Sequence, residues 1–220
     1  MRPAGLLFHT TNNWRDGTGD EMHGEYIRNT ERVVSWHVTV DQDSATQHLP
    51  FDENGWHAGD GTYGYYNRTW ISMEISCEAV EFGEPLDEAT YRNAVDVAAQ
   101  IMMRFGWDTV DRLEPHQVVY GKDCPHHTLF DSDAYKHDVL MLIESRKEEA
   151  RRMEELERQV AELTQRVQTL ERERSMPVPA WAREAIDAAV RAGYVDTPEG
   201  GSLDFYRMIT VMYRAGMFEG

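Results

Sequence analysis

Residues 71–78 read Ile-Ser-Met-Glu-Ile-Ser-Cys-Glu, and this stretch decides the fold. Apolar and polar side chains alternate along it, which is the two-residue period of a β-strand with one face in a core. The apolar face consists of Ile71, Met73, Ile75 and Cys77. The opposite face is polar and carries Glu74, whose carboxylate is costly to bury unless it faces a cleft or has a partner.

Three further segments extend this strand into a domain. Residues 33–40 are β-branched and aromatic and predict a strand that ends at the turn-forming residues 41–44. Apolar residues at helical spacing predict a helix that begins at Asp87 and stops at Gly106. Residues 110–113 predict a short strand. Strands mixed with a long helix indicate an α/β fold in which helices flank a sheet.

A heptad pattern begins after about Ile143. Its a and d positions are Met153, Leu156, Val160, Leu163, Val167 and Leu170. Val at a and Leu at d favour a parallel two-stranded coiled coil, and the oppositely charged residues Arg152 with Glu157, and Arg166 with Glu171, occupy g and e positions that would pair between strands. We therefore expect a parallel homodimer through residues 146–174. The alternative is a solvated helix that folds back on its own domain.

A small helical module follows the prolines at 177 and 179. One helical face is expected from Trp181, Ala185, Ile186, Ala189 and Val190, ending at Gly193. A second is expected from Leu203, Tyr206, Met208, Ile209, Met212 and Tyr213. The expected domains are thus a catalytic domain at 1–142, a coiled-coil linker helix at 143–175 and this module at 176–220.

Composition excludes several kinds of partner. The chain has 220 residues, with 22 Lys and Arg against 39 Asp and Glu, for a net charge of −17. Nucleic-acid binding relies on clustered basic residues, so a nucleic-acid partner is not expected. No stretch is long and apolar enough for a membrane span, and no signal peptide is recognisable. With only two cysteines, a disulfide framework is not expected.

Three residues could form an open zinc site: His9, His116 and Cys124. Zinc accepts two imidazoles and one thiolate, and a three-ligand tetrahedral site leaves a corner for a water that the metal acidifies. Glu74 could then take the proton from the water, and Lys122 could stabilise a developing oxyanion. The ordinary alternatives are polar histidines satisfied by hydrogen bonds, a buried apolar cysteine and a surface lysine.

Five motifs carry a resemblance to a known family. They are LFHTTN at 7–12, SWHVTVD at 35–41, GWHAGDG at 55–61, NRTWISMEI at 67–75 and GKDCPH at 121–126. In this order they closely resemble the zinc-dependent N-acetylmuramoyl-L-alanine amidases of the amidase-2 family, above all those of phage endolysins. The resemblance implies a mixed central β-sheet flanked by helices, and hydrolysis of the amide between the lactyl group of N-acetylmuramic acid and L-alanine in bacterial peptidoglycan.

Matched residue by residue, the resemblance places Zn²⁺ on His9, His116 and Cys124, the catalytic glutamate at Glu74 and the assisting lysine at Lys122. Some relatives have a tyrosine immediately before the histidine of the second motif, where this chain has Trp36. An indole cannot replace a phenol that donates through oxygen, so Glu74 is the better candidate base.

Other residues of these motifs have expected roles beside the metal. His37, Trp56 and His57 are expected to line the substrate groove, although Trp56 could instead be only a hydrophobic lid. The pair His126 and His127 is expected to shape the loop after Cys124 rather than to bind metal.

The module at 176–220 weakly resembles one S-layer-homology-like repeat, which implies attachment to the cell wall; an oligomer-forming cap is the alternative. The rival to catalysis is a peptidoglycan-binding or recognition protein that keeps the groove without cleaving, and the presence of Cys124 and Glu74 argues against it. Without a signal peptide, a phage enzyme is expected to wait in the cytoplasm of the infected host until its release to the wall.

Overall fold

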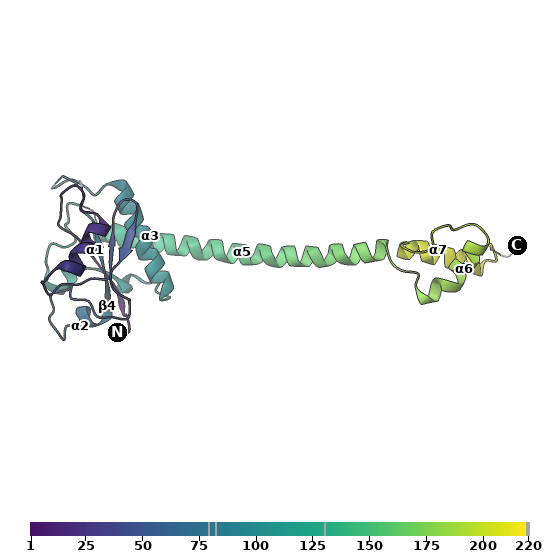
Figure 1. The fold of residues 1–220 in the computed structure, drawn as a ribbon, viewed down its shortest axis with the longest axis horizontal. Coiled ribbons are helices and arrows are strands. Elements are labelled where there is room, and N and C mark those ends of the chain that lie inside the picture. The colour runs from purple at the N-terminus through teal and green to yellow at the C-terminus, as the bar shows by residue number, and fades with distance from the viewer. Residues whose placement is uncertain (79, 82, 130, 219–220) are drawn as a thin grey trace. The chain divides into compact units, whose positions relative to one another are not determined.

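The computed structural model describes residues 1–78, 80–81, 83–129 and 131–218. The chain divides into two compact units, Met1–Glu149 and Ala150–Gly220. Helix α5 (Ser132–Arg174) runs from the first unit into the second (Figure 1). The division at 142 and 143 proposed from the sequence falls inside this helix. No helix in the described ranges is long and apolar enough to cross a membrane.

A five-stranded sheet forms the centre of the first unit. Its strands, in the spatial order β3-β2-β4-β1-β5, are β3 (Ala45–Gln47), β2 (Val38–Val40), β4 (Trp70–Ile75), β1 (Gly5–Thr10) and β5 (Leu113–Pro115). Strands β2, β4, β1 and β5 run parallel, and β3 pairs antiparallel to β2 at one edge. The expected mixed sheet is therefore confirmed.

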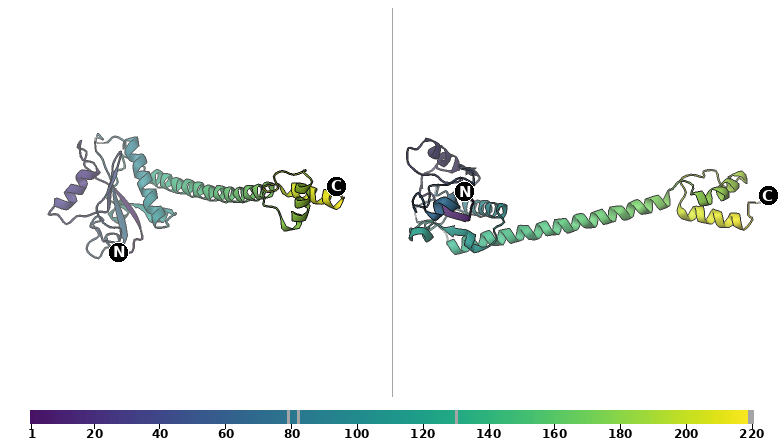
Figure 2. Two further views of the ribbon diagram at one scale, coloured as in Figure 1. Left: turned by 45° about the vertical axis from the view of Figure 1, so that its right-hand side comes forward. Right: turned by 90° about the horizontal axis from the view of Figure 1, so that it is seen from below.

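One face of this sheet is the hydrophobic core. Leu6 and Phe8 of β1 and Ile71 and Met73 of β4 point into it and are fully buried. Helix α3 (Glu88–Arg104) covers this face (Figure 2), and the first turns of α5 add Tyr135, Val139 and Ile143 to the same core. The remaining helices of the unit are α1 (Asp20–Asn29), α2 (Tyr65–Thr69) and α4 (Gln117–Tyr120).

The opposite face carries polar side chains at matching positions of neighbouring strands. Because side chains alternate between the faces of a strand, His9 shares a face with Glu74, its direct partner in the register of β1 and β4. Thr39 of β2 pairs with Glu74 on the other side. The polar face expected from residues 71–78 thus continues across three neighbouring strands, β1, β4 and β2.

Element boundaries differ from the sequence-based expectations in two places. Only Val38–Val40 of the expected strand 33–40 joins the ladder, because the backbone of Ser35 pairs with that of Trp56 in an isolated bridge instead. Residues Val110–Arg112 form a 3-10 helix (η1), and the strand starts only at Leu113. The expected helix from Asp87 is confirmed, with the Asp87 carboxylate accepting a hydrogen bond from the Thr90 amide.

The second unit contains the rest of α5 and a small helical module. The module consists of η2 (Ala180–Ala182), α6 (Arg183–Arg191) and α7 (Leu203–Arg214), so the two expected helices are confirmed. Its core includes Ile186 and Tyr206. Trp181, Val190 and Met208 were expected on the inner faces but are 52%, 41% and 57% exposed, because two short helices have too little surface to cover them.

Candidate active site

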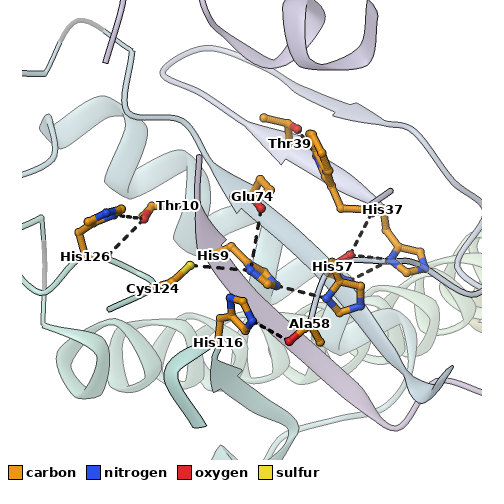
Figure 3. Close-up of polar contacts among 12 residues, drawn as sticks. His9, Thr10, His37, Thr39, His57, Ala58, Glu74, His116, Cys124 and His126 are labelled. Atoms are coloured by element: carbon orange, nitrogen blue, oxygen red, sulfur yellow. Dashed lines mark hydrogen bonds and ion pairs between the residues drawn. The ribbon is translucent and has the colours of Figure 1, made fainter. Parts of the chain in front are cut away.

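His9, His116 and Cys124 converge at one end of the parallel strands. His9 lies near the end of β1, His116 directly follows β5, and Cys124 lies in the loop after α4. One potential ligand atom from each lies within 4.8 Å of the others, and Cys124 Sγ is 3.8 Å from His9 Nδ1. All three side chains are buried. Figure 3 shows them pointing toward one another from separate elements.

The hydrogen bonds of the two histidines leave suitable nitrogens free for a metal. His116 Nε2 donates to the Ala58 carbonyl at 3.0 Å, whereas its Nδ1 is buried without a partner among the described residues. Burial lowers the pKa of His9 well below its usual value and also lowers that of His116. Both rings are therefore neutral at physiological pH, which is the form that binds metal.

Cys124 supplies the third potential ligand of the cluster. Burial, together with the nearby Glu74 carboxylate, raises the pKa of the Cys124 thiol to about 12. The thiolate form of Cys124 would be unstable there without a positively charged partner. Zinc would be such a partner, and its coordination would deprotonate the thiol. Two imidazole nitrogens and one sulfur are a donor set that fits Zn²⁺.

Glu74 stands beside this set with an unusual carboxyl group. Its Oε1 lies 3.9 Å from His9 Nδ1, and its Oε2 is buried with no hydrogen-bond partner in the described chain. Burial raises the pKa of Glu74 to about 7, against the opposing attraction of Lys122. Because His9 is neutral, the contact with His9 is not an ion pair. A carboxyl group with this pKa can both accept and release a proton near neutral pH.

A cleft of about 520 Å³ opens onto these groups. Lys122 and Cys124 lie on one side of it, and Trp36, Trp56 and Tyr26 lie along its walls. A larger hollow of about 660 Å³ near Asp20 and Asp41 has no histidine, cysteine or lysine in its described lining, so the chemistry belongs to the smaller cleft.

The expected groove residues have different positions. Trp56 and His57 line the cleft. His37 does not: it is fully buried, and its ring nitrogens contact Ser72 Oγ at 2.9 Å and the Glu53 carbonyl at 3.1 Å. The expected substrate contact of His37 is therefore not supported, because the ring instead ties β4 to the loop around Glu53.

Trp36 has its indole nitrogen committed elsewhere. It donates to Thr39 Oγ1 at 2.7 Å, and that hydroxyl contacts His48 Nε2 at 2.8 Å. The indole N–H is therefore not available as a donor to a substrate. His126 and His127 lie outside the metal-binding cluster, since His126 Nδ1 contacts Thr10 Oγ1 and His127 contacts Asp123.

Sequence reasoning missed the part of the cleft wall that α1 supplies. Met22, His23 and Tyr26 of α1 line the cleft, as does Arg32 in the segment that follows. No motif marks them, and only the tertiary position of α1 brings them to the cleft wall. Their contribution was therefore not readable from local pattern.

Comparisons with known proteins identify relatives of the first unit. A family model described as N-acetylmuramoyl-L-alanine amidase (Amidase_2) matches residues 1–127. The chain is 41% identical over 129 residues to the N-acetylmuramoyl-L-alanine amidase CwlH of Bacillus subtilis (strain 168), covering 59% of this chain and 50% of CwlH. It is 38% identical over 139 residues to XlyA of the same organism, covering 63% of this chain and 45% of XlyA. The chain thus spans about half the length of the curated relatives it matches.

Solved structures give the same result for the fold. The catalytic domain of XlyA superposes with a TM-score of 0.56 at 34% identity, covering 63% of this chain and 87% of that domain. PlyL superposes with a TM-score of 0.53 at 30% identity, covering 63% of this chain and 84% of that one. Since the family model matches more than half of the chain, this protein belongs to the N-acetylmuramoyl-L-alanine amidase (Amidase_2) family.

Proposed function

We propose that this chain hydrolyses the amide between the lactyl group of N-acetylmuramic acid and L-alanine in bacterial peptidoglycan. One observation carries the proposal: the buried carboxyl group of Glu74, whose pKa is raised to about 7, lies in the same cleft as the two-histidine, one-cysteine cluster and 3.9 Å from His9 Nδ1. Membership of the amidase family supports the choice of bond.

The resident metal in this proposal is Zn²⁺, held by His9, His116 and Cys124. When bound, zinc supplies Lewis acidity to a water and to the scissile carbonyl. Glu74 takes the proton of the attacking water and passes it to the amine nitrogen of L-alanine, which leaves as a free amino group. Lys122, on the cleft wall, places its ammonium group toward the oxyanion that develops on the carbonyl oxygen. Trp56 and His57 border the groove that receives the stem peptide.

The test is cleavage of purified peptidoglycan, followed by mass spectrometry of the products. We expect new L-alanine amino termini, their loss on chelation and their return with zinc. Glu74→Gln should abolish release, whereas Glu84→Gln, at an exposed position, should not. Binding of peptidoglycan without any product from the zinc-loaded protein would instead establish a recognition protein, and full turnover by Glu74→Gln would refute the assigned base.

We also propose that the protein acts as a phage endolysin that stays in the host cytoplasm until it is released to the wall. The structural likeness to an endolysin from Bacillus subtilis supports this setting. Fractionation of expressing cells, with and without membrane permeabilisation, tests it. Wall digestion from outside the membrane in intact expressing cells would contradict it.

A parallel homodimer through residues 146–174 is a further part of the proposal. All six heptad residues are 48–61% exposed on α5, so this stripe lacks cover within its own unit. In a parallel pair, Arg152 faces Glu157 of the second copy and Arg166 faces Glu171, and each attraction occurs twice. An antiparallel pair would keep fewer of these matches, so the charge pattern favours the parallel arrangement.

Sedimentation of the full chain tests the dimer. We expect a dimer that Leu163→Asp, at a d position, converts to a monomer, while Gln165→Asp on the outer face leaves it intact. Replacing Glu157 and Glu171 together with Arg should weaken a parallel dimer by placing like charges opposite each other. A monomeric wild-type chain at micromolar concentration would refute the proposal and favour the solvated helix.

The module at 176–220 is proposed to attach the enzyme to the cell wall. Two modules held together by a coiled coil would bind the wall more tightly than one, because binding of the first raises the effective concentration of the second. This gain would offset the weak wall affinity of a single module. Co-sedimentation with purified walls tests this, using the full chain and a chain that ends at residue 175. Equal wall binding by both would instead leave the module as an oligomer-forming cap.

A further inference from the structure

His57 contacts a metal-binding residue directly. Its Nδ1 lies 3.3 Å from His9 Nε2, and the two rings meet edge to face at 83°. Figure 3 marks this contact with a dashed line, and the other nitrogen of His57, Nε2, is buried. One ring nitrogen is therefore paired with His9 and the other is inaccessible to solvent, although the ring borders the cleft. This arrangement is unsuited to hydrogen bonding with a substrate.

The contact fixes which nitrogen of His9 carries the hydrogen. His9 Nδ1 faces Cys124 Sγ at 3.8 Å and Glu74 Oε1 at 3.9 Å, so it is the nitrogen directed at the metal position. A ligand nitrogen needs its lone pair, which leaves the hydrogen of His9 on Nε2. That N–H donates to His57 Nδ1, because a hydrogen bond between two imidazoles requires one donor and one acceptor.

The same short loop supports the second histidine ligand. The amides of His57 and Ala58 both donate to Asn67 Oδ1, at 2.9 and 2.8 Å, and the Ala58 carbonyl accepts from His116 Nε2 at 3.0 Å. Asn67 is itself buried. Consecutive residues of one anchored peptide thus accept hydrogen bonds from both imidazoles of the cluster.

Gly55 allows the His57 ring to take this position. A Cβ atom at Gly55 would lie 2.7 Å from His57 Cδ2, which is too close, and 3.2 Å from the Ser35 carbonyl oxygen, which is a tight contact. The ring is therefore packed against bare backbone on one side and His9 on the other. Its orientation is fixed by contacts on both sides.

We propose that His57 is a positioning residue for the metal centre, holding His9 in the tautomer and orientation that present Nδ1 to zinc, and is not a substrate contact. The inference rests on the proposed zinc site. Hydrogen-bond partners of metal-binding histidines typically contribute roughly 10–100-fold to metal affinity. We expect a contribution of this size from His57.

Two variants of matched shape test the role through zinc affinity, measured by competition with a chromophoric chelator in the absence of substrate. The amide oxygen of His57→Asn can replace Nδ1 as an acceptor, whereas His57→Leu has the same branching and no acceptor. We expect His57→Leu to weaken zinc binding roughly 10–100-fold and His57→Asn to stay close to wild type. His137→Gln, an exposed histidine on α5, is the control. Thermal unfolding of each metal-free variant verifies that it is folded.

The absorption spectrum of the cobalt-substituted protein gives a second, independent measurement. The thiolate-to-cobalt absorption of Cys124 should shift in His57→Leu and be restored in His57→Asn, which a general loss of stability would not produce. A folded His57→Leu with wild-type zinc affinity would overturn the proposal, as would a folded His57→Asn that loses affinity tenfold or more. If both variants raised KM and left zinc affinity unchanged, His57 would be a substrate contact. A wild-type chain that takes up no zinc would refute the proposed metal site itself.

Discussion

Glu74→Gln should stabilise the metal-free protein at alkaline pH. Burial raises the pKa of Glu74 from an ordinary value of 4.5 to about 7, so the folded state holds this proton more tightly than the unfolded chain does. The free energy of unfolding therefore falls as the pH rises from about 4.5 to about 7. Within this range the unfolded chain has released the proton and the folded protein still holds it. A glutamine at this position has no proton to lose and escapes that penalty.

The pKa shift sets the size of the effect. A rise from 4.5 to about 7 corresponds to roughly 3 kcal/mol at about 1.4 kcal/mol for each pH unit. Glu74 is only 16% exposed, so solvent screening reduces this value little. The amide must still be buried beside His9, which makes roughly 3 kcal/mol an upper limit for the gain above pH 7.

Urea unfolding in the presence of a chelator measures this difference. The free energies of unfolding of wild type and Glu74→Gln should differ by up to roughly 3 kcal/mol at about pH 8. The two values should converge near pH 4, where the folded and the unfolded wild type both hold the proton. Glu84→Gln is the matched exposed control and should follow wild type throughout. A gain of equal size at both pH values, or a loss at alkaline pH, would refute the reasoning that burial raises this pKa.

Three other changes should have distinct effects. Lys122→Met should lower kcat by about 10²–10³, the usual effect of losing one oxyanion donor, with little change in KM; a rise in KM alone would assign Lys122 to binding. Cys124→Ser should remove most bound zinc, measured by metal analysis after dialysis, and stoichiometric retention would contradict its role as ligand. Tyr206→Phe should destabilise the helical module by about 1–2 kcal/mol in urea, because its buried hydroxyl contacts the Met176 and Pro198 carbonyls and the Gly201 amide. No change would show that these bonds are replaced by water.

Local periodicity in the sequence predicted the faces of the strands and helices correctly where packing followed the pattern. The alternation in residues 71–78 placed Glu74 opposite the core, and the structure confirms this face. The alternation gave no information on which strand lies beside β4. The pairing of Glu74 with His9 depends on long-range strand order, which no local pattern encodes.

His37 shows why the expected groove residues were harder to assign. His37 belongs to the motif at 35–41 and directly precedes strand β2, and an imidazole is a residue type that suits substrate binding. Two groups distant in the sequence, the Glu53 backbone carbonyl and the Ser72 side-chain hydroxyl, contact its two ring nitrogens. His57 is the converse case, because its contact with His9 joins segments 48 residues apart. Ligand chemistry and the family resemblance of the motifs proposed the candidate site, whereas the contacts of individual residues within it required the fold.

The two faces of the sheet explain how the chain tolerates an unfavourable site. Glu74 Oε2 and His116 Nδ1 are buried without partners among the described residues, and such groups typically cost about 1–3 kcal/mol each. Each strand that carries one polar residue toward the cleft also carries apolar residues toward α3, because successive side chains alternate between faces. Phe8 and Met73, next to His9 and Glu74 in the chain, are fully buried in that core. Burial of these apolar neighbours in sequence thus stabilises the strands that carry the proposed metal ligands and the proposed base. Zinc binding would offset only the cost of the buried polar groups.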